Sequence, residues 1–328
     1  MVFEFIAEPS FDFLTSFGRQ IGVPVHNNSL KIPASLGEGS IRRIELGDDF
    51  KGIVHRYRLH QDFVLRRKAP AVPQDLITII LNSNETPGKW MSTGQGDISF
   101  SKNNDSAVQI ASTDIDTETF FPAHTDIYFM VIGVSSIVLN SLLHMDRPNA
   151  LVDVIRKPLS SFLFYESMTP DMQRVFVELT GSNNRKDFLV RLYCQNKVRE
   201  IIHLLFSKLV HRECAQHNKV HNTDADRILK VRAAILTDLS QPPHLENLAT
   251  LVGMSETKMK GLFKQVFGDS IYNYYQAARM TEAARLLRQG GLSVSETGYQ
   301  LGFSNLSHFS RLFERHHGLK PKKYTLAG

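Results

Sequence analysis

The chain has 328 residues, of which 42% are hydrophobic and 22% charged, and this composition excludes collagenous, low-complexity and wholly disordered proteins. Because a single hydrophobic core rarely extends beyond about 250–300 residues, a chain of this length is expected to form more than one domain, and we expect two. Its two cysteines, Cys194 and Cys214, are too few for a disulfide framework or a four-cysteine zinc site.

Positive charge is concentrated in the last third of the chain. Residues 1–223 contain 24 basic and 24 acidic residues, whereas residues 224–328 contain 14 basic and 9 acidic residues. A local excess of +5 is expected of a domain that binds a polyanion such as nucleic acid. An excess of this size over about a hundred residues also arises by chance, so the charge alone is weak evidence.

The sequence gives no sign of export or membrane insertion. No basic segment followed by an apolar run opens the chain, and we therefore expect no signal peptide. The longest apolar passage, from Ile127 to Leu143, is interrupted by Gly133, Ser135 and Ser136, and it is shorter than the roughly 18–20 residues of a membrane helix. We expect a cytoplasmic protein that has no membrane partner.

Residues 1–134 are expected to form mostly β-strands, after a short helix at Phe11–Ile21. Apolar runs of six to eight residues at Gly52–Leu59, Leu76–Leu81 and Ile127–Val134 indicate strands. Clusters of turn-forming residues punctuate the segment at 37–40, 47–49, 82–84 and 93–97. Closely spaced short strands with little helical periodicity predict a sandwich or a barrel.

Residues 136–215 have helical spacing and complete an amino-terminal domain, 1–215. Thr169 followed by Pro170 predicts the capped start of one helix. A longer helix is predicted from Asp187 to about Cys214, with an apolar stripe made of Phe188, Leu192, Val198, Ile202, Leu205 and Leu209. That stripe is either a dimer contact or part of the domain's own core. Residues 216–226 lack periodicity and are expected to form a linker.

Residues 227–328 are expected to form an all-helical domain. Caps and periodicity predict six or seven short helices at about 227–239, 245–251, 256–267, 271–288, 294–301, 305–316 and 321–325. Ser255, Ser293 and Ser304 are predicted to cap the starts of helices, because a serine hydroxyl can accept a hydrogen bond from a free backbone N–H. Helix ends are predicted at Gly268, at Gly290 or Gly291, and at Gly318.

One pattern occurs twice in this helical domain. The first copy runs from Leu245 through Gly253-Met254-Ser255 to Gly268, and the second from Val294 through Gly302-Phe303-Ser304 to Gly318. The two glycine corners are 49 residues apart. An apolar-faced helix, a glycine turn, a serine and a second two-faced helix have the layout of a helix-turn-helix unit. Two such units in tandem indicate DNA binding much more strongly than one.

Over residues 227–326 the sequence resembles the AraC/XylS family of bacterial transcriptional regulators. The matching residues are Leu248-Ala249, Gly253-Met254-Ser255, Leu262-Phe263-Lys264, Phe267-Gly268, Tyr275, Arg279-Met280, Ala283, Leu286-Leu287, Gly302-Phe303, Ser307, Phe309-Ser310-Arg311, Phe313, Gly318, Pro321 and Tyr324. The departures are Thr297-Gly298 where the family usually has Ile-Ala, Lys320 in place of threonine, no arginine after Tyr324, and glycine at position 261. Gly298 is expected to loosen its helix by up to about 1 kcal/mol relative to alanine.

The resemblance implies a multidomain α+β protein that ends in a homeodomain-like tandem helix-turn-helix domain. It also implies sequence-specific binding to double-stranded DNA, contact with RNA polymerase, activation more often than repression, and a place on the bacterial nucleoid. Candidate base contacts are Thr257, Lys260, Leu306, Ser307, Ser310 and Arg311, with Arg311 and Lys260 best suited to guanine. Candidate phosphate contacts are Ser255, Lys264, Ser304, Lys322 and Lys323.

For the first domain the resemblance implies a cupin-like fold that binds a small-molecule effector or mediates homodimer formation. A module that only dimerises or binds another protein is the alternative, and an apolar cavity with a few inward polar groups would favour the sensor. His55 and His60 are spaced so that a strand would place them on opposite faces, which disfavours a metal site. No nucleophile motif, P-loop or dinucleotide fingerprint is present, and we expect neither enzymatic activity nor a cofactor.

Overall fold

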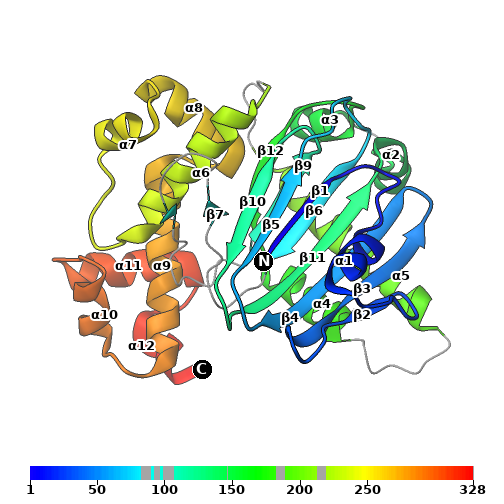
Figure 1. Cartoon of the computed structure of the whole chain (residues 1–328). Helices are drawn as coiled ribbons and strands as arrows, with labels where there is room; N and C mark the ends of the chain where they lie inside the picture. Colours follow the sequence, from blue (N-terminus) through cyan, green and yellow to red (C-terminus); the bar gives the residue numbers. More distant parts are fainter. Residues whose placement is uncertain are drawn as a thin grey trace. The chain divides into compact units, whose positions relative to one another are not determined.

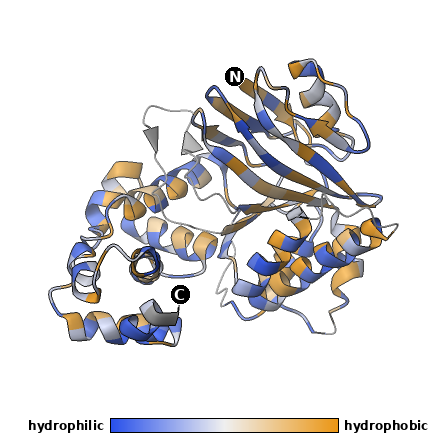
Figure 2. Cartoon of the chain, turned by 90° about the horizontal axis from the view of Figure 1, so that it is seen from below, coloured by the Kyte–Doolittle hydropathy of each residue, from blue (hydrophilic) through white to orange (hydrophobic). Residues whose placement is uncertain are grey.

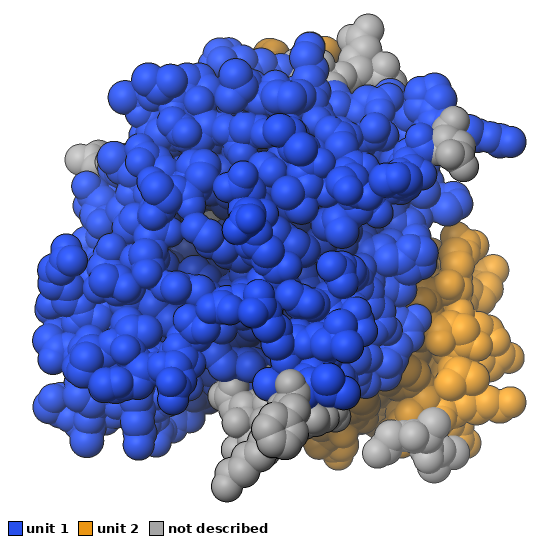
Figure 3. Space-filling view, turned by 90° about the vertical axis from the view of Figure 1, so that its right-hand side faces the viewer, with its two compact units in different colours: residues 1–97, 105–225 blue, residues 98–104, 226–328 orange. Residues whose placement is uncertain are grey.

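The computed structural model describes residues 1–82, 90–91, 97–98, 107–145, 147–181, 189–212 and 219–327. The chain divides into two compact units, one formed by residues 1–97 and 105–225 and the other by residues 98–104 and 226–328 (Figure 3). The first unit is built of β-sheets and helices, and residues 226–327 consist of helices and short connections (Figure 1). This order of a strand-rich part, further helices and an all-helical part confirms the predicted fold class.

The larger sheet of the first unit has seven antiparallel strands in the order β12-β9-β6-β11-β4-β3-β2. In the same order their bounds are Leu163–Ser167, Ala107–Ser112, Ile77–Asn82, Asp126–Val134, Phe50–Leu59, Gly37–Gly47 and Ser29–Lys31. The three predicted strands are therefore confirmed as β4, β6 and β11. Polar and apolar residues alternate along many of these strands, as expected of strands whose two faces differ (Figure 2).

The smaller sheet has three strands in the order β1-β5-β10, with bounds Val2–Ile6, Phe63–Lys68 and Thr117–Phe121. Strand β1 runs parallel to β5, and β10 runs antiparallel to it. Strands β7 (Trp90–Met91) and β8 (Asp97–Ile98) pair with each other. The predicted turn at 93–97 lies mostly outside the described residues.

The two faces of the larger sheet belong to two different hydrophobic cores. Ile79 and Ile132 lie on the face that packs against helices, and both are fully buried. Their neighbours Ile80 and Val131 lie on the opposite face, toward the core that includes residues of the smaller sheet. Both of these are only partly buried, which indicates that the space between the two sheets is incompletely filled.

Among the described residues, five helices belong entirely to the first unit. Their bounds are Phe13–Ile21 for α1, Ser136–Leu143 for α2, Ala150–Arg156 for α3, Pro170–Thr180 for α4 and Val190–Leu209 for α5. Helix α1 confirms the helix predicted near residue 11, although it begins two residues later at a cap formed by Asp12. The cap at Thr169 is also confirmed, since its side chain accepts a hydrogen bond from the N–H of Met172 at 3.2 Å.

The apolar stripe of α5 packs inside its own unit. Val198, Ile202, Leu205 and Leu209 are buried in the core that also contains residues of the larger sheet. Of the two predicted roles of this stripe, core packing is therefore the one observed for these residues, and they do not form a free dimer face. Leu192 is exposed, and Phe188 and Cys214 lie outside the described residues.

Two local predictions about the first unit are wrong. The segment expected to be helical throughout contains strand β12, which pairs with β9 at the edge of the larger sheet. Its aromatic and apolar residues gain more from burial against β9 than from helix formation, because Phe164 and Leu163 are almost wholly inaccessible there. The cluster at 37–40 is not a turn but the start of β3, where Gly39 has a φ of +103° beside Tyr57 of β4.

The predicted linker 216–226 is also shorter than expected. Helix α6 spans Asn222–Thr237, so residues 222–226 are its first turn. The start of α6 is not evident from the sequence because its residues are polar. In the structure, the backbone N–H groups of Asp224 and Ala225 both donate hydrogen bonds to the carbonyl of His221. Asp224 also carries a negative charge in the first turn, where the helix dipole favours one. Of the remaining positions, 216–218 lie outside the described residues.

The other helices of the second unit lie close to their predicted positions. They are α7 (Leu245–Val252), α8 (Glu256–Phe267), α9 (Ile271–Gln289), α10 (Val294–Gln300), α11 (Leu306–His317) and α12 (Pro321–Ala327). The caps at Ser255 and Ser293 are confirmed, as are the helix ends at Gly268, Gly290 and Gly318. None of the helices in the described ranges combines the length and apolar content needed to cross a bilayer.

Ser304 does not cap α11. The cap is the next residue, Asn305, whose side-chain oxygen accepts a hydrogen bond from the N–H of His308 at 3.0 Å. Asparagine and serine serve this role about equally well, so composition could not distinguish the two neighbouring positions.

Candidate nucleic-acid interface and inter-sheet cavity

Two helix-turn-helix units are present in the second unit, formed by α7–α8 and by α10–α11. The turn of each contains a glycine in the left-handed region, Gly253 at φ +61° and Gly302 at φ +75°. At Gly302 a Cβ atom would lie 1.9 Å from the backbone oxygen of Ser240, so glycine is required there by space as well as by conformation. The connection between α6 and α7 therefore lies directly against the second turn.

Helix α8 separates an apolar face from a charged one. Met259, Phe263 and Val266 are buried, whereas Thr257 and Lys260 are exposed. Lys260 forms an ion pair with Glu256 at 2.9 Å, and both side chains remain about half exposed. An exposed pair of this kind contributes only about 0.3–0.5 kcal/mol, so Lys260 can exchange it for an anionic partner at little cost.

Helix α11 has the same two-faced arrangement. Phe309 and Phe313 are buried, Ser307 and Arg311 are exposed, and Ser310 is half-buried. Arg311 forms no ion pair with any residue that the structure describes, and its guanidinium is available to an external acceptor. These residues come from the first half of α11, and the N-terminal residues of a recognition helix are the ones that contact base edges in the major groove.

Leu306, another candidate base contact, lies close to the backbone of α10. Its side chain is half-buried against α10, where a Cβ atom at Gly298 would approach its Cδ2 to 2.7 Å and a ring carbon of Phe309 to 3.2 Å. The first turn of α11 therefore lies almost in contact with the backbone of α10. Gly298 is needed for this close approach. From the sequence, we expect only that it loosens α10.

Arg279 joins the middle helix to the second helix-turn-helix unit. It extends from α9 and donates hydrogen bonds to the carbonyl of Leu301, with its Nε at 3.2 Å. Its guanidinium lies 3.7 Å from the centre of the Phe303 ring, and burial lowers its pKa. The sequence placed Arg279 among the matching residues but gave no indication of this role, because its partners are 22 and 24 positions away.

The five candidate phosphate contacts are all exposed. Ser255 and Lys264 lie at the two ends of α8, Ser304 precedes α11, and Lys322 and Lys323 lie in the first turn of α12. The side-chain oxygen of Ser255 already accepts the cap bond from Lys258 at 3.3 Å. Its hydroxyl hydrogen is still able to donate to an acceptor such as phosphate.

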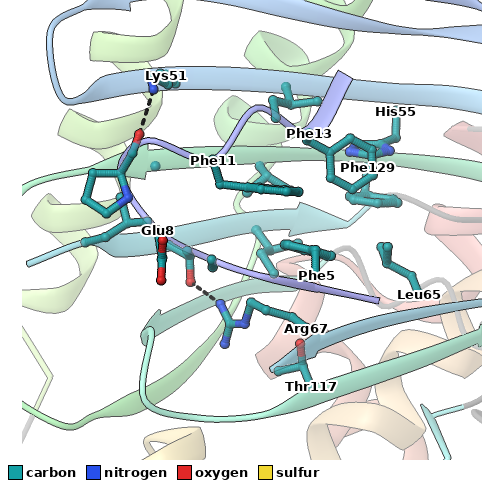
Figure 4. A pocket seen from close by; sticks show the side chains of 18 of the residues that line it. Phe5, Glu8, Phe11, Phe13, Lys51, His55, Leu65, Arg67, Thr117 and Phe129 are labelled. Carbon is teal, nitrogen blue, oxygen red and sulfur yellow. Dashed lines mark hydrogen bonds between the residues drawn. The ribbon is translucent and has the colours of Figure 1, made fainter. Parts of the chain in front are cut away.

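A second candidate site lies in the first unit, between the two sheets. It is a cavity of about 170 Å³, close to the roughly 150 Å³ of a protein cavity that holds benzene. Five phenylalanine rings contribute to its wall, those of Phe5, Phe11, Phe13, Phe121 and Phe129. All of them except Phe121 are labelled in Figure 4. The partly buried residues Ile80 and Val131 line the same space.

The register of the smaller sheet explains which of its side chains reach the cavity. Arg67 of β5 pairs with Phe5 of β1 and with Thr117 of β10, and all three line the cavity. Two residues earlier on β5, Leu65 lines it as well. The run Phe63, Leu65, Arg67 thus places an arginine where the strand alternation calls for an apolar residue, a signal that sequence reasoning missed.

Two titratable groups of the cavity wall are deeply buried. Arg67 donates hydrogen bonds to Thr78 Oγ1 at 2.9 Å and to the carbonyl of Ile115 at 2.8 Å, and burial lowers its pKa to about 10. It therefore remains charged at neutral pH. His55 stacks on Phe129 with ring centres 4.0 Å apart, and burial lowers its pKa to about 3.

The histidines that were weighed as metal ligands do not come together. His55 lies inside the unit, whereas His60 is exposed beyond the end of β4, with its ring 5.7 Å from that of His124. The described residues include no group of three histidine, cysteine or acidic side chains placed to hold a metal ion.

Comparison with known proteins finds similarities to the second unit. Residues 248–326 match a family described as a helix-turn-helix domain. The chain is 28% identical over 100 residues to the HTH-type transcriptional regulator GbdR of Pseudomonas aeruginosa, a match covering 30% of this chain and 27% of GbdR. The chain therefore spans about a quarter of the length of GbdR.

Two further similar proteins are shorter than this chain, and the match covers most of each of them. The multiple antibiotic resistance protein MarA of Salmonella typhimurium is 28% identical over 105 residues, which are 32% of this chain and 83% of MarA. The crystal structure of a probable AraC family transcriptional regulator from Rhodopseudomonas palustris is 27% identical and covers 31% of this chain and 96% of that one, with a TM-score of 0.29. Each similarity involves about a third of the present chain.

Proposed function

The carboxy-terminal unit of this chain contains a helix-turn-helix domain of the AraC type, and from that premise we propose that the protein is a sequence-specific DNA-binding transcriptional regulator. The observation that carries the proposal is the presence of two complete helix-turn-helix units, each with an exposed polar face on its second helix. Helices α8 and α11 would enter successive major-groove segments, about one turn of DNA apart.

Specific readout is assigned to six residues. Those that would contact base edges are Thr257 and Lys260 of α8 and Leu306, Ser307, Ser310 and Arg311 of α11. Arg311 is the strongest candidate, since an arginine can donate two hydrogen bonds to O6 and N7 of guanine. Ser255, Lys264, Ser304, Lys322 and Lys323 would contact phosphates, which position the protein without reading sequence.

We extend the proposal to an effector that binds in the first unit. The cavity supports a sensor over a module that only dimerises, because a mainly apolar space with a few inward polar groups is typical of small-molecule sites. Binding would shift the balance between two states of the protein that differ in DNA affinity. Activation through RNA polymerase, homodimer formation and a place on the bacterial nucleoid, in the cytoplasm, are parts of the same proposal.

The first test is binding of the full chain to DNA from the region upstream of its own gene. Increasing salt and an excess of unrelated competitor DNA separate specific from non-specific association. Saturable binding that survives the competitor is expected. If the competitor DNA abolished all binding to the upstream DNA, both with and without a cavity ligand, the result would contradict specific recognition.

Variants of Arg311 and Lys322 test the assigned roles. Arg311→Ala should cost about 1–3 kcal/mol on the preferred site and relax the preference at particular base pairs. Lys322→Ala should weaken binding to all sequences about equally and reduce the salt slope by about one. A uniform loss on all sequences from both variants would contradict base readout by Arg311.

A further inference from the structure

The inference concerns the chemistry of the inter-sheet cavity, and it rests on the proposed role of that cavity as an effector site. Arg67 is 5% exposed, and its positive charge faces a wall made largely of aromatic and aliphatic side chains. Both of its hydrogen-bond partners, the Thr78 hydroxyl and the Ile115 carbonyl, are neutral. Its Nε has no hydrogen-bond partner, and it forms no ion pair with any of the described residues.

The two carboxylates that attract Arg67 electrostatically, those of Asp116 and Asp114, are engaged elsewhere. Asp116 accepts hydrogen bonds from the N–H of Ala69 at 2.6 Å and from Lys68 at 3.5 Å, and Asp114 is bonded to the hydroxyl of Ser112. They attract the guanidinium from a distance but do not contact it. A buried charge without a contacting counterion is costly, and an anion brought to it gains charge-assisted hydrogen bonds.

Three acidic residues also line the cavity, so a cationic ligand has to be considered as well. Glu8 and Asp49 are exposed to solvent, and Asp75 accepts hydrogen bonds from the backbone and the hydroxyl of Ser136. Solvent therefore screens the charges of Glu8 and Asp49, and hydrogen bonds stabilise that of Asp75. The charge of Arg67 is neither screened by solvent nor paired with a contacting carboxylate. A cationic ligand would gain contact with the aromatic rings but would place its charge near that of Arg67.

The size of the space limits the rest of the ligand. About 170 Å³ accommodates a body of roughly one aromatic ring with a short substituent. His55 lies on the other sheet, and its Nδ1 has no hydrogen-bond partner among the described residues. Since His55 is neutral, it offers a second polar contact without adding a second charge.

We propose that the cavity binds a compact, mainly apolar monoanion whose carboxylate pairs with Arg67 and whose apolar body lies among the phenylalanine rings. Arg67 supplies one buried positive charge, so further negative charges on a ligand would lack a buried partner. Arg67 therefore selects for the acid over neutral molecules of the same shape.

Three probes of one skeleton test this selection on the full chain. Phenylacetate, phenylacetamide and 2-phenylethylammonium differ mainly in charge, and their affinities are measured by titration calorimetry at neutral pH. Phenylacetate is expected to bind at least roughly tenfold more tightly than phenylacetamide, and the ammonium compound more weakly than both. Equal affinity of acid and amide, tighter binding of the ammonium compound, or no binding of any probe at millimolar concentration would overturn the proposal.

Two variants on the same strand identify the residue responsible. Arg67→Met removes the inward charge and should bring the ratio of acid to amide affinity close to one. Arg66→Met is the matched control, because Arg66 lies on the other face of β5 and pairs with Glu118 and Glu4. It should preserve the preference for the acid. Should Arg67→Met fail to fold, the comparison of the three probes on the unaltered chain still decides the proposal.

The effect of phenylacetate on DNA binding separates this inference from the proposed function. Selective binding of the acid through Arg67 without any change in DNA affinity would support the site and contradict its role as an effector site. Specific DNA binding by a chain that does not prefer the acid would support the regulator and overturn the ligand assignment.

Discussion

Gly261 and Gly298 both lie inside helices, but only one of them is needed there. No atom lies within 4 Å of a Cβ built at Gly261, which is exposed on α8. At Gly298 the same Cβ would meet Leu306 at 2.7 Å. Replacing glycine by alanine gains the same helix-propensity free energy at both positions. The surrounding atoms therefore decide whether the substitution raises or lowers the stability of the unit.

Gly261→Ala is therefore expected to raise the free energy of unfolding of the second unit by up to about 1 kcal/mol. Gly298→Ala should lower it by about 1–2 kcal/mol, because the cost of overpacking exceeds the gain in helix propensity. Urea denaturation of both variants beside the parent chain measures the difference. Stabilisation by Gly298→Ala would contradict the close contact between α10 and α11.

His55 should make the stability of the first unit depend on pH. Its pKa in the folded unit is about 3, against about 6.5 in the unfolded chain, so between these values the unfolded state binds more protons. The contribution is fully present above pH 6.5 and is lost as the pH falls, by about 1.4 kcal/mol per pH unit. From pH 6.5 to pH 5 the expected loss is about 2 kcal/mol.

His55→Phe should remove this part of the pH dependence while retaining the ring stacked on Phe129. Denaturation curves at several pH values between 5 and 7.5 give the slope for each variant. His60→Gln, at an exposed position, is the control and should leave the slope unchanged. An identical slope in the parent chain and in His55→Phe would exclude His55 as its source.

At the scale of elements, the start of α11 sets the orientation of the proposed reading helix. Asn305 caps it, and Ser304 immediately before it is exposed and does not. Loss of a capping side chain typically costs about 1 kcal/mol, whereas an exposed serine outside the helix contributes little. The two adjacent residues therefore provide a matched pair.

Asn305→Ala is expected to lower the free energy of unfolding of the second unit by about 1 kcal/mol, and Ser304→Ala by less than about 0.5 kcal/mol. Thermal unfolding followed by circular dichroism distinguishes the two. If Ser304 contacts a phosphate as proposed, Ser304→Ala should weaken binding to every DNA sequence alike. A larger loss of stability from Ser304→Ala than from Asn305→Ala would contradict the observed cap.

For the whole molecule, the charge distribution and the division into units suggest that DNA affinity resides in the second unit. All of the excess positive charge lies within residues 224–328. Helix α6 belongs mainly to this unit, since Arg232 donates a hydrogen bond to Tyr274 of α9 at 2.6 Å and Ile228 and Val231 are fully buried. A fragment that begins with α6 should therefore fold alone.

The fragment 222–328 is expected to bind the same DNA as the full chain, with affinity within about tenfold and the same salt slope. Phenylacetate should have no effect on it, because the cavity is absent. The fragment 238–328 lacks α6 and should not fold, which circular dichroism and thermal unfolding report. A salt slope much smaller than that of the full chain would show that the first unit also contacts phosphates.

The candidate sites were predictable to very different degrees. The exposed face of α8 and the exposure of Arg311 follow from helical periodicity, and the structure agrees with both. The half-buried position of Leu306 was not predictable, because its neighbour Gly298 belongs to the preceding helix. The cavity was not predicted, since its walls combine residues from six strands of two sheets, and their register is not encoded in any one strand.

By itself, the sequence determined the helices of the second unit, their order, most of their caps and the duplicated helix-turn-helix pattern. These features depend on interactions among residues three or four positions apart, which composition and spacing express directly. Tertiary structure alone decided the strand order, the return of β12 to the larger sheet, the contact at Gly298 and the burial of Arg67 and His55. Each of these depends on packing between segments that are distant along the chain, and sequence-local propensities do not specify which segments meet.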